Sequence, residues 1–246
     1  MSPASRRPRW RPLLRWLGIL VLTWLVVTWL AVLMLRFIPP LTSAVMIERQ
    51  VGAWIHGEKD FHLRQHWVPW KKVSPWVPLA MVAGEDQKFP YHHGFDFESI
   101  DKAVNAADDG KRLRGASTIS QQTAKNLFLW NGRSFVRKGL EAYFTVLLEL
   151  TWPKQRILEV YVNIAELGNG IYGVGAASEA YFHTTPAHID PAQAARLAAV
   201  LPSPRRMHVD QPSAYVLRRA AWIRQQMEQL GGPGYVEGRA PPQPPQ

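Results

Sequence analysis

The feature that most constrains this chain is an apolar run without charge from Trp16 to Leu35, which Arg36 closes. Twenty residues at about 1.5 Å each reach about 30 Å in a helix, which is the thickness of a bilayer core. A cleaved signal peptide is the alternative, but its apolar region usually has about 7–15 residues, and FIPPL after the run is a poor cleavage site. The run therefore predicts an uncleaved transmembrane helix.

The charges around this run predict its orientation. Residues 1–15 contain five arginines and no acidic residue, whereas only Arg36 follows directly. The positive-inside rule places the amino terminus in the cytoplasm and the rest of the chain outside it. A net charge of +10 would also suit nucleic acid, but half of it lies in this segment. We therefore expect a membrane and no nucleic acid as a partner. The absence of cysteine excludes disulfides and thiolate zinc sites.

The sequence divides into five segments. We expect a cytoplasmic basic segment (1–15), a transmembrane helix (16–35), a juxtamembrane connector (36–75), a catalytic domain (76–230) and a disordered tail (231–246), in which nine of sixteen residues are Gly or Pro. The connector is rich in tryptophan, histidine and lysine. It could lie on lipid headgroups or pack on the surface of the domain, and the sequence leaves both alternatives open.

The pattern after Pro78 is helical nearly throughout, and no run of alternating strands appears. Caps and apolar spacing predict helices at Phe97–Asp109, at Ser117–Leu127, from Ser134 to about Leu150, after Pro153, after Asp190 and from about Ser213 to Leu230. On the helix after Ser134, the residues expected to face inward are Phe135, Ala142, Tyr143, Val146, Leu147 and Leu150. The fold class predicted for the domain is mainly α.

A dense group of acids, histidines and aromatics occurs in EDQKFPYHHGFD, Glu85 to Asp96. It follows VPLAMVAG, an apolar run typical of a buried helix, so Glu85 is expected where packed structure meets a cleft. Partial desolvation raises the pKa of a carboxyl there and suits it to proton transfer. The alternative is a solvated acidic turn.

Two later stretches carry cations and amides. In GASTISQQTAKNL, helical spacing places Thr118, Gln121, Gln122 and Lys125 on one face, where they either bind phosphate or sugar oxygens or form an ordinary polar surface. In NGRSFVRKGLEAYF, several cations precede Glu141 and suit a diphosphate leaving group, although helical ion pairs would explain them equally well. Glu85 and Glu141 together meet the minimum of two carboxyls for glycosyl chemistry.

Five ordered blocks across residues 75–212 carry a family resemblance. They are EDQKFPYHHGFD, GASTISQQTAKNL, RKGLEAYFTVLLEL, KQRILEVYVNIAELGNGIYGVGAASEAYF and AARLAAVLPSPRRMHVDQP. Together they resemble the peptidoglycan glycosyltransferases of family 51, which include monofunctional biosynthetic transglycosylases and a domain of bifunctional penicillin-binding proteins. The resemblance implies a lysozyme-like large lobe, a small membrane-dipping lobe and an anchor in the bacterial inner membrane, with the catalytic domain in the periplasm.

The resemblance also implies an activity and roles for single residues. The activity is polymerisation of lipid II with inversion and release of undecaprenyl diphosphate. Glu85 resembles the base that deprotonates the acceptor hydroxyl, Asp86 its support, and Glu141 the second essential glutamate. The matches to diphosphate contacts are Lys125 and Arg133, with Lys138 a further candidate, and the matches to cleft positions are Ser117, Thr118, Gln121 and Asn126.

The resemblance implies lipid II and the growing lipid-linked glycan as substrates, and other cell-wall synthesis or division proteins as further partners. No organic cofactor is expected; a divalent cation, Mg or Mn, would assist through the diphosphate, since the sequence shows no protein cage for a metal. A glycan-cleaving lysozyme or lytic transglycosylase is the enzymatic alternative, and it leaves the cations unexplained because cleavage releases no diphosphate. A non-catalytic membrane scaffold is the other alternative.

Overall fold

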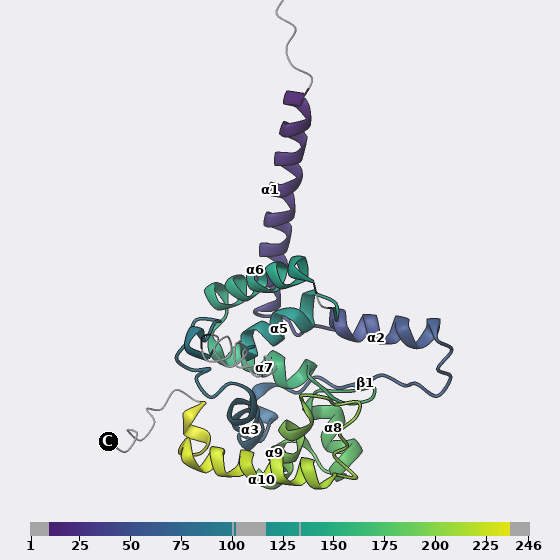
Figure 1. The fold of residues 1–246 in the computed structure, drawn as a ribbon, viewed down its shortest axis with the longest axis vertical. Helices are drawn as coiled ribbons and strands as arrows, with labels where there is room; N and C mark the ends of the chain where they lie inside the picture. The colour runs from purple at the N-terminus through teal and green to yellow at the C-terminus, as the bar shows by residue number, and fades with distance from the viewer. Residues whose placement is uncertain (1–9, 100, 102–116, 133, 237–246) are drawn as a thin grey trace, which may run out of the picture. The chain divides into compact units, whose positions relative to one another are not determined.

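The computed structural model describes residues 10–99, 101, 117–132 and 134–236, and the chain forms two compact units, 1–38 and 39–246 (Figure 1). The first unit contains α1 (Trp10–Leu35). Its stretch Leu13–Leu35 has a mean hydropathy of 2.5 and is long and apolar enough to cross a membrane. The expected apolar helix is confirmed, and it is compatible with a single-pass anchor.

The second unit is built mainly from helices, which confirms the mainly α class. Its α-helices are α2 (Ala44–Ile55), α3 (Trp76–Glu85), α5 (Ile119–Phe128), α6 (Phe135–Thr151), α7 (Lys154–Ile164), α8 (Gly173–Phe182), α9 (Pro191–Val200) and α10 (Ala214–Gln229). Short 3₁₀ helices occupy η1 (Trp70–Lys72), η2 (Pro186–His188) and η3 (Pro233–Tyr235). The predicted helix 97–109 lies largely outside the described residues.

Side-chain caps fix the starts of several helices where the sequence predicts them. Ser134, Asp190 and Ser213 each accept a hydrogen bond from the backbone N–H three residues later, at the starts of α6, α9 and α10. Thr118 caps α5 through a reciprocal capping box with Gln121. These signals are local, so the sequence alone places them correctly.

The core of this unit surrounds α3, in which every residue from Val77 to Ala83 is buried. α3 contacts α7, α9 and α10, while α5 contacts α6 and α7. In Figure 1, α6 and α10 lie at opposite ends of this unit. The buried α3 ends at Glu85, as its apolar sequence predicts.

A small sheet, which the sequence analysis did not predict, joins residues far apart in the chain. Its strands, β1 (Arg64–Gln65), β2 (Glu166–Gly168) and β3 (Ile171–Tyr172), lie in the order β1-β3-β2. β1 runs parallel to β3, with Arg64 opposite Ile171, and β2 runs antiparallel to β3 with an irregularity between Glu166 and Gly168.

The segment expected to be a connector is therefore part of the domain, because the second compact unit begins at Pro39 rather than at residue 76. Val45, Met46 and Ala53 of α2 are buried. Asn163 of α7 forms two hydrogen bonds with the backbone of Val68, accepting from its N–H at 2.7 Å and donating to its carbonyl at 2.9 Å. The residues of this segment therefore pack on the domain, while contact of its exposed side with lipid headgroups stays a prediction.

Two further predictions need correction. On α6, Phe135 is 98% exposed and Leu150 77% exposed, whereas Glu141, Phe144, Thr145 and Leu148 are the buried residues, so the predicted inward face is wrong. The predicted tail also begins too early, because Tyr235 is buried and donates a hydrogen bond to the Gln87 carbonyl at 2.6 Å. Residues 237–246 lie outside the described residues.

Asn163→Ala should destabilise the domain by about 3 kcal/mol, because it leaves the buried N–H and carbonyl of Val68 without partners. Thermal unfolding of the detergent-solubilised full chain measures this change. The exposed Gln225→Ala is the matched control and should stay within about 0.5 kcal/mol of wild type. An Asn163 variant as stable as this control would contradict the stabilising role of the two hydrogen bonds between Asn163 and Val68.

Candidate active site

Glu85 occupies the last position of α3, where the buried helix meets a cavity of about 320 Å³. This first cavity is lined by Ala83, Gly84, Glu85, Asp86, Gln87, Lys88, Asp96, Ser99, Ser117, Thr118 and Trp222. The side chain of Glu85 is only 15% exposed. A carboxyl with this burial beside a cavity fits the sequence-based expectation of an acid at a cleft.

Two neighbouring elements hold the carboxylate of Glu85. Gln122 of α5 donates from Nε2 to Glu85 Oε2 at 2.9 Å, and Arg219 of α10 donates from Nη2 to Oε1 at 3.2 Å. Tyr161 of α7 in turn donates its hydroxyl to Gln122 Oε1 at 2.9 Å, which fixes the orientation of the amide. Each carboxylate oxygen therefore has one donor and retains a lone pair for another proton.

Burial raises the pKa of the Glu85 carboxyl above its usual value, and the Asp86 carboxylate acts in the same direction. The hydrogen bond from Gln122 and the positive charge of Arg219 oppose this increase. The group is thus easier to protonate than a solvated glutamate while two donors still favour its ionised form. These are properties of a general base.

Asp86 connects this site to the start of α5. Its Oδ2 accepts the N–H of Ile119, the first residue of α5, at 2.9 Å. His92 Nε2 lies 2.9 Å from the same oxygen, while its Nδ1 accepts the Gly94 N–H at 3.1 Å. Because Nδ1 is an acceptor, the proton is on Nε2 and points to Asp86. Asp86 thus links the residue after Glu85 to the start of α5, and its expected supporting role stays a prediction.

Gly94 lets the loop after Asp86 approach α5 and α6. Its φ is +89°, and a Cβ there would lie 2.8 Å from Thr145 Cγ2. Its carbonyl accepts the Thr118 hydroxyl at 2.7 Å. An alanine at this position would meet both a strained backbone conformation and a steric clash.

The predicted cleft residues of α5 separate into two groups. Thr118 and Gln121 are buried and use their polar atoms in the helix cap, so they shape the site rather than present donors to it. Ser117 is exposed at the edge of the first cavity. Lys125 and Asn126 line a second cavity, where Gln122 joins them.

This second cavity, of about 250 Å³, is mainly polar. Its lining includes Val45, Gln122, Lys125, Asn126, Asn131, Tyr161, Ile164, Ala165, Glu166, Leu201, Pro202 and Pro204. Burial lowers the pKa of the Lys125 ammonium, and the charge of Glu141 opposes that decrease. Among the described residues no side chain forms an ion pair with Lys125, so this cation is available to an anionic ligand.

Glu141 is buried on α6 and binds two cations from its own helix. Arg137 Nη1 lies 2.5 Å from its Oε2, and Lys138 Nζ binds its Oε1. The ion pairs expected from spacing are therefore present. Arg137, Lys138 and Glu141 together carry a net charge of +1, and Lys125 brings the sum for these four residues to +2. Arg133, the other predicted diphosphate contact, lies outside the described residues.

Two of the groups nearest to Glu85 could not be selected from the sequence. Arg219 lies on the helix predicted from about Ser213 to Leu230, and Tyr161 lies on the helix predicted after Pro153. Gln122 was placed on the polar face of α5 but not selected as a site residue. No local signal could pair Arg219 with Glu85, since 134 residues separate them.

No group of three His, Cys, Asp or Glu residues in the described part of the chain is arranged to hold a metal ion. The available charges are cations on α5 and α6 and carboxylates that already have partners. Such a set of cations suits an anionic ligand.

Comparisons with known proteins identify relatives over nearly the whole chain. The sequence model of the family described as Transglycosylase matches residues 52–228. A biosynthetic peptidoglycan transglycosylase of Xanthomonas euvesicatoria pv. vesicatoria is 52% identical, covering 96% of this chain and 94% of that relative. Relatives with the same description in Xanthomonas campestris pv. campestris and Chromohalobacter salexigens are 53% and 52% identical, covering 95% and 91% of this chain and 95% of each relative.

Glu85→Gln should raise the melting temperature at about pH 8. Burial raises the pKa of Glu85 in the folded protein above its value in the unfolded chain. Ionisation of Glu85 therefore lowers the free energy of unfolding as the pH rises between these two pKa values, and glutamine, which does not ionise, avoids this loss. The difference should vanish below about pH 4, where the carboxyl is neutral in both states. Melting curves of the full chain at both pH values, with the exposed Glu228→Gln as control, measure this. A destabilised Glu85→Gln at pH 8 would contradict the assigned direction.

Proposed function

Because the chain belongs to the transglycosylase family, we propose that it is a peptidoglycan glycosyltransferase that polymerises lipid II into glycan strands with inversion and releases undecaprenyl diphosphate. The observation that carries this proposal is the connection made by α5. Gln122 on this helix binds the buried Glu85 carboxylate, and one turn later Lys125 lies in the polar cavity. A base and an anion-binding cation are thus held by one rigid element.

In the proposed step, Glu85 accepts the proton of the acceptor sugar's 4-hydroxyl. The hydroxyl oxygen forms a bond to the anomeric carbon of the lipid-linked strand, while the bond from that carbon to the diphosphate oxygen breaks. The electron pair leaves with undecaprenyl diphosphate. Attack from the face opposite the leaving group inverts the anomeric centre.

The cations stabilise the leaving diphosphate in this mechanism. Lys125 has no ion-pair partner among the described residues and is close enough to Glu141 for their charges to interact. Arg137 and Lys138 are oriented by the buried Glu141. Fixed positive charges at a developing anion lower the barrier because they need no reorganisation. We assign Arg133 to the same group on family resemblance alone.

A divalent cation fits this scheme if the diphosphate oxygens are its ligands. It would supply further charge stabilisation when bound. Within the described segments, Asp86 and Glu141 are committed to protein partners, so neither carboxylate is available as the main ligand.

The exposed apolar face of α6 supports contact with the membrane. It comprises Phe135, Val136, Val146 and Leu150, and α2, which packs on α5, exposes Ile47, Val51, Trp54 and Ile55. A hydrogen bond joins α2 to the loop before α6, because Asn131 in that loop donates its backbone N–H to Glu48 Oε2 at 2.7 Å. We assign these faces to the outer leaflet surface, where the lipid-linked substrates are held.

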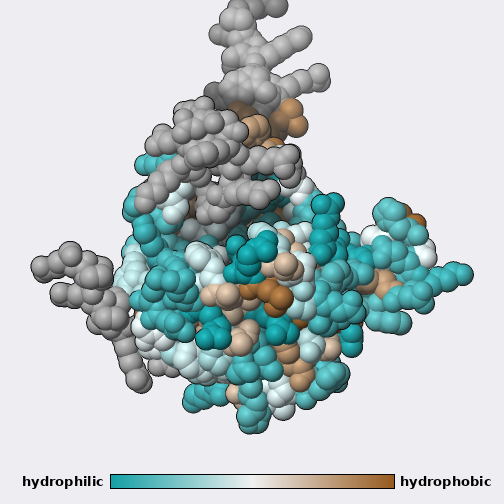
Figure 2. All heavy atoms as spheres, turned by 60° about the horizontal axis from the view of Figure 1, so that its bottom comes forward, coloured by the Kyte–Doolittle hydropathy of each residue, from teal (hydrophilic) through white to brown (hydrophobic). Residues whose placement is uncertain are grey.

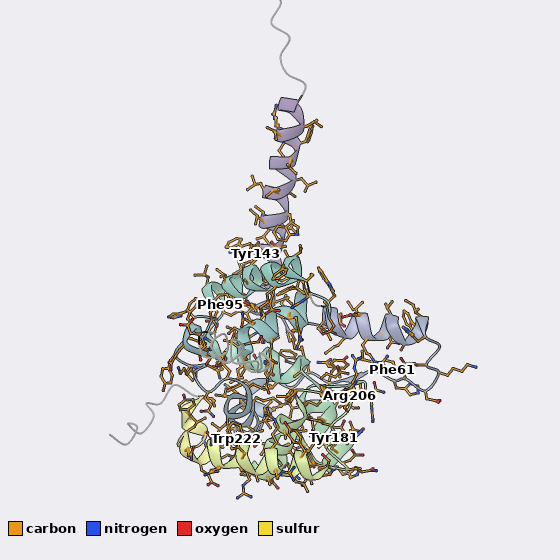
Figure 3. The ribbon with its side chains drawn as sticks, in the orientation of Figure 1. Phe61, Phe95, Tyr143, Tyr181, Arg206 and Trp222 are labelled. Carbon is orange, nitrogen blue, oxygen red and sulfur yellow. The ribbon has the colours of Figure 1, made fainter. Side chains whose placement is uncertain are left out.

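The opposite end of the domain has a different surface. Figure 2, which turns the α10 end towards the viewer, shows a face that is mainly hydrophilic. Figure 3 places Tyr143 on α6 at one end and Trp222 on α10 at the other. This difference between the two surfaces favours an orientation with α6 towards lipid and α10 towards the periplasm. The five arginines in residues 1–15 support an amino terminus in the cytoplasm of a bacterial inner-membrane protein.

Purified full-length protein should convert labelled lipid II into long glycan strands. Glu85→Gln should lower the initial rate by about 10²-fold or more, because the base is lost. Glu141→Gln should also lower it strongly, since its partners Arg137 and Lys138 lose their orientation. The exposed Glu228→Gln is the control and should retain wild-type activity.

Two outcomes of this assay would overturn the assignments. Polymerisation at the normal rate by Glu85→Gln would exclude Glu85 as the base. Release of short fragments from preformed glycan by the wild type, without strand synthesis, would identify a cleaving enzyme instead.

Single cysteines test the membrane face, since the natural sequence has none. A nitroxide on Leu150→Cys in liposomes should be relaxed mainly by lipid-soluble oxygen, because this position is 77% exposed on the apolar face of α6. The same label on Gln225→Cys in α10 should be relaxed mainly by a water-soluble nickel chelate. Equal nickel access at both positions would show that α6 does not enter lipid.

A further inference from the structure

The carboxyl-terminal helix α10 contributes a cation to the site of Glu85. Arg219 Nη2 lies 3.2 Å from Glu85 Oε1 and also 3.2 Å from the carbonyl of Gly84. Its side chain is 21% exposed, and its Nε is buried with no hydrogen-bond partner among the described residues. Arg219 Nη2 thus donates to both the Glu85 carboxylate and the backbone carbonyl of the preceding residue, Gly84.

Close packing of two helices produces this contact. Val216, Ile223 and Met227 are the buried residues of α10. A Cβ on Gly84 would lie 3.2 Å from Ile223 Cδ1, so the glycine allows α10 to approach the end of α3. Arg219 lies one turn before Ile223 and therefore reaches the last turn of α3. The adjacent Arg218 is exposed.

Few charged or titratable groups act on Glu85 from the elements packed around it. They are Asp86 in its own segment, Tyr161 on α7 and Arg219 on α10, while Gln122 on α5 is uncharged. Burial raises the pKa of Tyr161 well above its usual value, so its phenol stays neutral. Arg219 is thus the one positive group among these neighbours in the described part of the chain.

We propose that Arg219 is a positioning residue that holds the Glu85 carboxylate in its ionised form and aims its free lone pairs at the acceptor hydroxyl. This inference rests on the proposed function, in which Glu85 is the base. Burial alone would favour the protonated carboxyl, which cannot accept a proton. Arg219 supplies the opposing charge at a position where little water screens it.

A purely structural role for Arg219 predicts a different result. Its bond to the Gly84 carbonyl could simply attach α10 to α3, in which case its loss would lower stability or activity equally at every pH. With an electrostatic role, the loss of activity depends on pH, because Glu85 is protonated more readily at low pH once the positive charge of Arg219 is removed. The pH profile therefore separates the two roles.

The test compares Arg219→Gln, Arg219→Lys and wild type in lipid II polymerisation by the full-length protein in liposomes. For Arg219→Gln, we expect kcat/KM to fall about tenfold at pH 6 but less than about threefold at pH 9. Arg219→Lys keeps the charge and should restore most of the activity at pH 6. Arg218→Gln is the matched control and should follow the wild-type profile.

Two results would overturn the inference: an Arg219→Gln profile with the wild-type pH dependence, or equal losses at pH 6 for the glutamine and lysine variants. If Arg219→Gln does not fold, Arg219→Lys supplies the test. A kcat/KM for Arg219→Lys that differs from wild type at low pH then contradicts the proposal, and a pH profile that matches wild type supports it. Glu85→Gln, assayed in parallel, separates the two proposals. If it stays active, the base assignment fails; if it is inactive while Arg219→Gln behaves as wild type, only the present inference fails.

Discussion

The site depends on the contact between the Asp86 carboxylate and the amino end of α5. Asp86 follows Glu85 directly, so its bond to the Ile119 N–H holds Glu85, the proposed base, close to the helix that carries Gln122 and Lys125. A carboxylate at a helix amino terminus is stabilised by unpaired N–H groups and by the helix dipole. His92 completes its hydrogen bonds, so the buried charge does not lack partners.

The sequence predicts features that depend on near neighbours. The caps at Ser134, Asp190 and Ser213 and the emergence of Glu85 from a buried helix are encoded within a few residues. Contacts between distant segments are not encoded locally. The sequence therefore leaves the packing of residues 44–73 as one of two alternatives and does not predict the Arg219–Glu85 pair. On α6, apolar spacing identifies a face but cannot show whether protein or lipid covers it, since both exclude water.

The structure sets two requirements of the reaction against each other. Desolvation makes Glu85 a stronger base, yet it also favours the protonated form that cannot react. Gln122 and Arg219 approach the carboxylate from two helices and offset part of that effect. Lys125 meets the opposite situation, because burial lowers its pKa while a diphosphate would stabilise its charge. The same helix, α5, thus carries both the amide that binds Glu85 and the cation proposed to bind the diphosphate.

A structure of the full-length protein with an unreactive lipid II analogue would show whether α5 connects the base to the diphosphate site. We expect the diphosphate to contact Lys125 in the polar cavity, and an acceptor sugar hydroxyl to lie about 3 Å from a Glu85 oxygen. A diphosphate bound instead in the cavity beside Trp222, with no sugar hydroxyl near Glu85, would contradict it.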